Sequence, residues 1–187
     1  MKKITAPLSR EGARTLRCGE PVLLSGVIYT ARDAAHKRLL ESAQKGEPLP
    51  FDIENAIVYY VGPTPSKPGD VIGSAGPTTS GRMDIFAPTL IALGQTGMIG
   101  KGARCHEVIV AMQEYGAVYF GAIGGAGALL ASCVKTVEVI AYEDLGTEAI
   151  RKLTVREMPL TVVIDCEGND LYIQGRANYL QSVKRRV

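Results

Sequence analysis

The sequence lacks the cysteine spacing of a metal site. Its four cysteines lie far apart, and no two of them form a Cys-x-x-Cys pair: Cys18, Cys105, Cys133 and Cys166. Zinc and iron–sulfur centres in proteins are held by closely spaced cysteines. We therefore expect four free, mostly buried thiols and no metal bound by this chain.

The sequence also lacks a strong excess of charge and a long apolar run. Its formal net charge is +2, and its basic residues are scattered except at 184–186. A nucleic-acid-binding surface needs a basic stripe, so this class of partner is excluded. No apolar stretch reaches the ~18 residues of a membrane span, and no secretory segment follows Met1. We expect a cytoplasmic protein that binds no membrane.

The composition is that of one globular domain. The chain has 187 residues, of which 46% are hydrophobic and 21% are charged, and no internal repeat is visible. A domain of this size buries roughly 70% of its unfolded surface, so it needs no disulfide or structural metal. We expect a single domain over residues 1–187, with tails at 1–6 and 184–187.

Apolar periodicity predicts strands that alternate with helices. Strands are expected at 21–29, 55–61, 117–120, 134–140 and 160–165. The run at 55–61 is nearly all apolar, so this strand is expected to be buried on both faces. Helices are expected at 32–44 and 83–93, and a helix or the start of a strand at 103–115. Turns are expected where glycines cluster, at 97–102, 121–127 and, as a hairpin, 168–172. This order predicts an α/β fold with a mixed sheet.

The first candidate site is the segment 76–84, GPTTSGRMD. Its hydroxyl groups are flanked by glycines, and Arg82 follows them at an apparent helix start. Glycines allow close backbone approach, while helix-start amides and a guanidinium bind carboxylates. A turn capped by Thr79 or Ser80 is the simpler interpretation. Three hydroxyls and an arginine are more than a cap requires.

The second candidate is the segment 97–102, GMIGKG, where Lys101 stands between two glycines. Such a lysine can reach a buried anion or lower the pKa of a neighbouring hydroxyl. The segment is no P-loop, because Gln95 and Gly102 stand where that motif needs Gly and Ser or Thr. Nucleotide binding is therefore rejected here.

The third candidate is the start of the first long helix. Arg32 and His36 lie four residues apart and so share a helix face, which places two cationic or hydrogen-bonding groups together. Asp33 is explained by the helix dipole alone. A lone histidine is more often structural than functional.

These segments together resemble a known family. Residues 32–36 (RDAAH), 76–84, 97–102 and 143–146 (EDLG), in this order, are similar to the beta subunit, or C-terminal domain, of class I fumarases and L-tartrate dehydratases. The resemblance runs over nearly the whole chain. It implies a swivelling β/β/α domain. It also implies an alpha subunit that holds a four-iron, four-sulfur (4Fe-4S) cluster through its own cysteines, and hence a hetero-oligomer.

The resemblance assigns roles to residues of this chain. Thr78 is the implied base, and Lys101 is its catalytic partner. Arg32, Arg82 and Lys101 bind the dicarboxylate substrate, and Thr79 supports this binding with a hydrogen bond. His36 and Asp84 are expected behind them, orienting these groups. An alkoxide at Thr78 requires a strongly cationic site that excludes water.

Three functions remain open at this point. The sequence favours the beta subunit of a fumarate hydratase, which hydrates fumarate to L-malate and is active only with its alpha subunit. An L-tartrate dehydratase beta subunit shares the same motifs. A non-catalytic protein that binds small dicarboxylates is the third possibility.

Overall fold

Five strands close into a barrel, and two more strands extend its wall. The computed structural model describes residues 1–123 and 125–184. Its strands are β1 (Lys2–Ala6), β2 (Pro21–Thr30), β3 (Ile57–Tyr59), β4 (Gly97–Gly100), β5 (Val118–Gly121), β6 (Val134–Ala141) and β7 (Ile150–Ile164). They follow the order β1-β2-β3-β4-β5-β7-β6, and a further pairing of β2 with β7 closes the barrel.

Parallel and antiparallel pairs occur in the same sheet. Strands β1 to β5 pair parallel with one another, whereas β7 pairs antiparallel with β2, β5 and β6. The expected α/β fold with a mixed sheet is confirmed. Because β2, β3 and β4 are adjacent and parallel, their carboxyl ends lie together at one edge.

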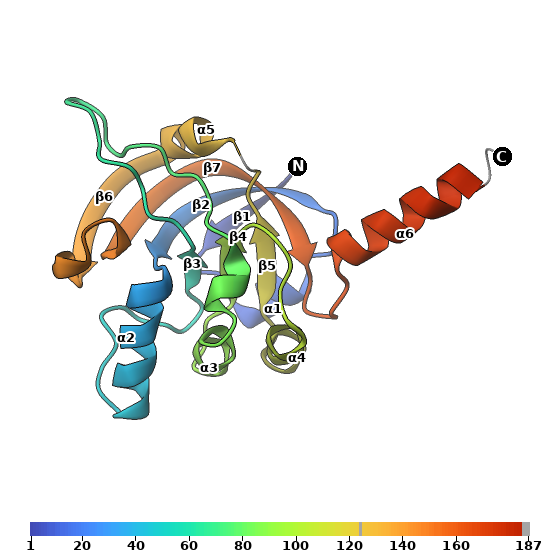
Figure 1. The fold of residues 1–187 in the computed structure, drawn as a ribbon, viewed down its shortest axis with the longest axis horizontal. Helices are drawn as coiled ribbons and strands as arrows, with labels where there is room; N and C mark the ends of the chain where they lie inside the picture. Colours follow the sequence, from blue (N-terminus) through green and yellow to red (C-terminus); the bar gives the residue numbers. More distant parts are fainter. Residues whose placement is uncertain (124, 185–187) are drawn as a thin grey trace.

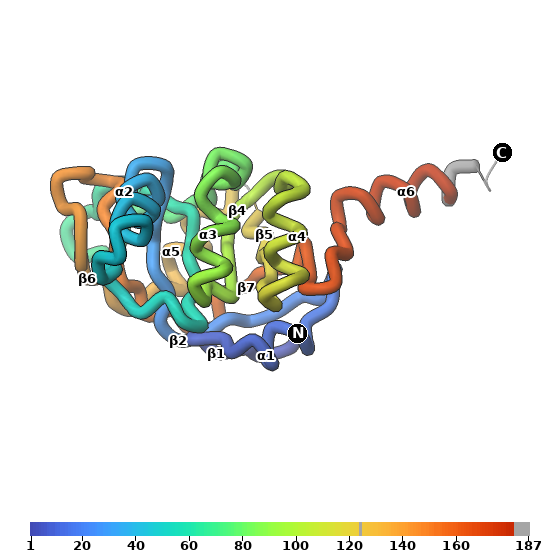
Figure 2. The backbone as a smooth tube through the Cα atoms, turned by 90° about the horizontal axis from the view of Figure 1, so that it is seen from below, coloured from blue at the N-terminus to red at the C-terminus, as the bar shows by residue number. Residues whose placement is uncertain are grey.

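The helices cover the outside of the barrel. They are α1 (Arg10–Arg14), α2 (Asp33–Gln44), α3 (Ala87–Ala92), α4 (His106–Tyr115), α5 (Gly127–Ser132) and α6 (Leu171–Lys184), with short 3₁₀ helices η1 (Ser80–Met83) and η2 (Glu143–Glu148). Helices α2, α3 and α4 stand in a row along one side, and α5 lies on the other (Figures 1 and 2). Helix α6 extends away from the barrel.

Two hydrophobic cores follow from the alternation of side chains along the strands. In β3, Ile57 and Tyr59 belong to the core inside the barrel, while Val58 belongs to the core beneath α2, α3 and α4. In β5, Phe120 points inward and Tyr119 outward in the same way. Both faces of these strands are buried, as the near-continuous apolar run at 55–61 predicts.

Several expectations about local structure were wrong. Residues 2–6 form β1 rather than a tail, because they add a parallel strand to β2. The segment 97–102 contains the buried strand β4 rather than a turn. The turn expected at 168–172 is closed by an antiparallel bridge between Ile164 and Asp170, but it leads into α6 rather than into a second strand. The helix expected at 83–93 is shorter, and the strand expected at 160–165 is the end of the longer β7. Residues 185–187 of the expected tail, and Gly124, lie outside the described residues.

No helix in the described part of the chain is long and apolar enough to span a membrane.

Candidate active site

The residues singled out from the sequence gather at the carboxyl ends of β2, β3 and β4. Arg32 comes two residues after β2 and caps α2, and Lys101 directly follows β4. The hydroxyl segment begins where the long loop after β3 returns to the sheet, and η1 continues it (Figure 1). The carboxyl edge of parallel strands is where α/β proteins commonly bind ligands.

Thr79 and Lys101 lie side by side. The amide of Thr78 donates to the carbonyl of Tyr60 over 2.7 Å, and the amide of Ser80 donates to the carbonyl of Lys101 over 2.9 Å. Thr79 and Lys101 thus pair like residues of two parallel strands. Two segments far apart in sequence therefore present their hydroxyl and ammonium groups at one edge. Thr78 is half-buried, while Thr79 and Lys101 are exposed.

Gly100 allows this close approach. A Cβ atom at this position would lie 1.9 Å from the hydroxyl oxygen of Ser80 and 3.2 Å from the ring of Tyr60. We expect Gly100→Ala to lower the free energy of unfolding by about 1–3 kcal/mol, because overpacking forces the two segments apart. Urea unfolding measures this loss. Gly175→Ala, where nothing lies within 4 Å, is the matched control and should cost nothing; equal losses in both variants would contradict the steric explanation.

The carboxylate of Asp33 joins Arg32 and Arg82. From the sequence, Asp33 had a role only at the helix dipole. Asp33 accepts a hydrogen bond from Nε of Arg82 at 2.8 Å, and its other oxygen lies 3.9 Å from Nη2 of Arg32. Glu148, from η2, lies 3.5 Å from the same Arg32 nitrogen and also accepts from the amide of Ala34 at 3.0 Å. The two arginines are thus held near one another before any ligand binds.

Arg32 is also packed tightly from behind. A Cβ atom at Gly62 would lie 2.7 Å from Nη1 of Arg32 and 3.2 Å from the carbonyl oxygen of Thr147. The glycine therefore lets the loop after β3 and the η2 segment close on the guanidinium. Residues 143–146, which contribute to the family resemblance, form the start of η2. Thr147 and Glu148, which directly follow this motif, make the contacts at Gly62 and Arg32.

The ring of His36 contacts the backbone of Arg32, and His36 contributes no charge to the site. Its ring is fully buried, Nδ1 lies 3.0 Å from the carbonyl oxygen of Arg32, and the ring packs edge-on against Tyr60. Burial lowers the pKa of His36 to about 4, although the bond to Arg32 opposes this shift. The side chain is therefore neutral at pH 7, and the shared face of Arg32 and His36 carries one cation, not two.

This buried histidine predicts a pH dependence of stability. The unfolded chain protonates His36 near pH 6.5, whereas the folded chain resists protonation until about pH 4. Stability should therefore fall as the pH falls below 6.5, by about 2 kcal/mol from this group at pH 5. Urea unfolding at pH 7 and pH 5 should show this loss in the parent and not in His36→Gln. Replacing the exposed His106 by Gln should keep the loss; if His36→Gln keeps it too, the explanation is wrong.

Asp84 orients a different arginine from those expected. Its Oδ1 accepts from Nε of Arg104 at 2.6 Å, and its Oδ2 accepts from the amide of Cys105 at 2.7 Å. The sequence predicted that Asp84 orients the substrate-binding groups. In the structure it instead binds Arg104 and the amide of Cys105. Arg104 carries no signal in the sequence, because only the folded chain places it against Asp84.

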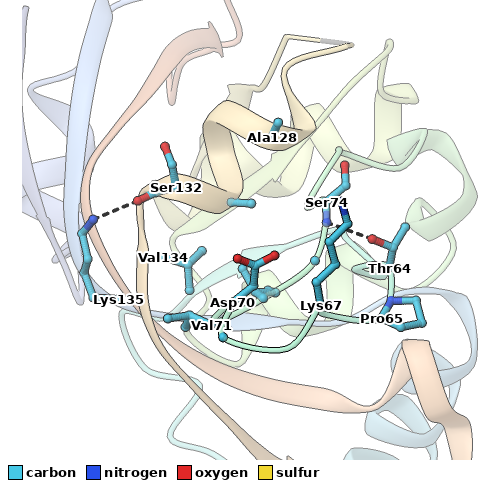
Figure 3. A pocket seen from close by; sticks show the side chains of 14 residues that line it. Thr64, Pro65, Lys67, Asp70, Val71, Ser74, Ala128, Ser132, Val134 and Lys135 are labelled. Carbon is cyan, nitrogen blue, oxygen red and sulfur yellow. Dashed lines mark hydrogen bonds between the residues drawn. The ribbon is translucent and has the colours of Figure 1, made fainter.

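A cavity lies away from the predicted site residues. It measures about 680 Å³ and opens between the loop after β3, helix α5 and strand β6, with Lys67, Asp70 and Lys135 at its wall (Figure 3). None of the seven site residues predicted from the sequence lines it. The candidate site on this chain is instead an exposed edge.

The cysteines do not fit an iron–sulfur cluster. Cys133 and Cys166 are buried, Cys18 and Cys105 are half-buried, and all four are free. Among the described residues no group of three or more His, Cys, Asp or Glu side chains is arranged to hold a metal ion.

Comparison with known proteins decides the family. Residues 2–175 match the family model described as fumarase C-terminus. The chain belongs to this family. It is 40% identical over 176 residues to an aerobic class I fumarate hydratase of Escherichia coli K12, a match that covers 93% of this chain and 31% of the relative. The fumarase-family chain thus spans about a third of the length of that enzyme.

A second kind of relative has nearly the same length. The chain is 40% identical over 171 residues to a protein of Methanocaldococcus jannaschii named putative L(+)-tartrate dehydratase subunit beta, and the match covers 88% of each. It is also 39% identical over 156 residues to fumarate hydratase 2 of Leishmania major, covering 82% of this chain and 28% of the relative. Fumarase C-terminal sequences thus occur both within long chains and as a separate subunit.

Proposed function

We propose that this chain is the substrate-holding part of an iron–sulfur-dependent hydro-lyase and that fumarate and L-malate are its substrates. The observation that supports this most directly is the placement of two arginines, a lysine and two threonines at one strand edge in a member of the fumarase C-terminus family. Arginine binds carboxylates through paired hydrogen bonds. A dicarboxylate needs such a cation for each end.

In this proposal the chain's own residues hold the substrate and move one proton. Arg32, Arg82 and Lys101 bind the two carboxylates, and Thr79 donates a supporting hydrogen bond. Thr78 takes the proton from the carbon next to a carboxylate when water is lost and returns it when water adds. The developing negative charge is stabilised by the same cations, which act where charge appears in the transition state.

The 4Fe-4S cluster belongs to a partner in this proposal. The described residues of this chain contain no cysteine arrangement that fits it. A relative of nearly the same length is named a subunit beta, which supports assembly with a separate alpha subunit. The chain and its partner would then form a hetero-oligomer in which each part is inactive alone.

Tartrate is the second candidate substrate, because the relative named for L(+)-tartrate matches at the same identity as the fumarate hydratases. The test is to co-express the chain with the protein that matches the remaining length of the class I fumarate hydratases. The kcat/KM of the purified complex is then measured for fumarate, L-malate and L(+)-tartrate. We expect fumarate and L-malate to be preferred. A preference for tartrate would select the second function, and activity on none of them would reject both.

A further inference from the structure

A buried arginine lies behind the candidate site. The side chain of Arg104 is 0% exposed, and its guanidinium carbon lies 5.4 Å from the centre of the Tyr60 ring and 5.1 Å from that of Tyr119. Nε donates to Asp84, and Nη1 lies 3.3 Å from the sulfur of Met98. Burial opposes the charge of Arg104, yet Tyr60 and Asp84 raise its pKa above the ordinary value. It is therefore a buried cation.

Each partner of this cation also holds a segment of the site. Asp84 caps the end of η1 and, through the Cys105 amide, ties it to the segment that follows β4. The carbonyl of Tyr60 accepts a hydrogen bond from the amide of Thr78. Both partners, Asp84 and Tyr60, lie against the Arg104 guanidinium.

Tyr119 makes the third tie. Its hydroxyl lies 2.9 Å from the hydroxyl of Ser80 and donates to the carbonyl of Gly102 over 3.0 Å. Ser80 stands next to Thr79, and Gly102 stands next to Lys101. The ring that stacks on Arg104 therefore links the segments on which Thr79 and Lys101 are carried.

We propose that Arg104 is a positioning residue that keeps the segment 78–82 in register with Lys101. It is too deeply buried to touch a substrate, so it acts through Asp84, Tyr60 and Tyr119. A planar guanidinium can present its faces to two rings while its edge donates to a carboxylate, whereas a lysine ammonium has neither a planar face nor a fork of donors. The role in turnover rests on the proposed function, but the effect on the two segments does not.

The first test measures hydrogen–deuterium exchange of the full chain for Arg104→Lys. We expect amides in 76–84 and 100–105 to exchange about 10-fold faster or more, because local opening of these segments no longer has to break the Asp84 bond and both ring contacts. Strands β2 and β7 should keep the parental exchange rate. The matched control is Arg38→Lys, since Arg38 also pairs with an aspartate, Asp144, and lies over the ring of Tyr142, but on the surface.

The second test uses the complex with the alpha subunit. Arg104→Lys should lower kcat by about 10- to 10²-fold, because small misplacements of reacting groups have effects of that size, whereas KM should change less. Arg38→Lys should change neither. Asp84→Asn keeps the shape of the pair and removes its charge, so it should reproduce both effects of Arg104→Lys if the latter does not fold.

Two results would overturn the proposal. One is exchange that stays parental in both segments, and the other is exchange that rises equally over the whole chain, which would show a purely structural role. If the parental complex neither hydrates fumarate nor dehydrates tartrate, the proposed function fails. The exchange measurement on the chain alone still decides the role of Arg104 in that case.

Discussion

Thr78→Ala is expected to lower kcat of the assembled enzyme by about 10²- to 10⁴-fold, the usual contribution of a group that transfers a proton in the transition state. KM for fumarate should change little, because Arg32, Arg82 and Lys101 still hold the carboxylates. The folded chain should be unaffected, since Thr78 is anchored through its backbone amide and not through its hydroxyl. Steady-state kinetics of the complex measures both parameters.

Two further variants separate Thr78 from its neighbour. Thr78→Ser keeps the hydroxyl and should retain far more activity than Thr78→Ala. Thr79→Ala should mainly raise KM, since its predicted role is to bind substrate. If Thr78→Ala turns over at the parental rate, or Thr79→Ala alone stops proton exchange at the substrate carbon, the base has been assigned to the wrong residue.

Lys101→Met should lower kcat/KM by about 10²- to 10³-fold, the effect of removing one donor that stabilises developing charge. KM should rise, because Lys101 is predicted to bind a carboxylate. In addition, kcat should fall, because Lys101 is predicted to support an anion at Thr78. Lys101 is exposed in this chain, so the loss should appear in kinetics and not in stability.

Lys45→Met is the matched control for Lys101. Lys45 is also exposed but caps the carboxyl end of α2, at the end of the helix opposite Arg32. It should leave kcat/KM unchanged. A parental kcat/KM in Lys101→Met would remove the lysine from the site, whereas a loss in both variants would indicate a general effect of charge on substrate approach.

The parts of the fold that could be predicted are those with a local signal. The apolar run at 55–61 predicted a strand buried on both faces, and β3 fulfils this because its two faces contact different cores. The spacing at 32–44 predicted α2 to within one residue. The glycine-rich segment 97–102 was wrongly predicted to be a turn. Gly97 and Gly100 bracket a strand, because their small size is needed where β4 packs against Ile57 and Ser80.

The contacts between site residues could not be predicted, because they depend on closure of the barrel. Asp33 meets Arg82 across 49 positions, and Glu148 meets the amide of Ala34 across 114. No local pattern marks Arg104 as the partner of Asp84 rather than as a surface charge. The motifs therefore predicted which segments form the site, while the sheet order determined which of them are neighbours.

The most direct test of the account is an anaerobic assay of this chain and its proposed alpha subunit, separately and mixed. Each preparation is first reconstituted with iron and sulfide, and its iron content and its rate of fumarate hydration are measured. We predict that the alpha subunit binds the cluster, that neither protein alone hydrates fumarate, and that the mixture does. A stoichiometric cluster on Cys18, Cys105, Cys133 or Cys166 of this chain, or full activity of the alpha subunit without it, would contradict the account.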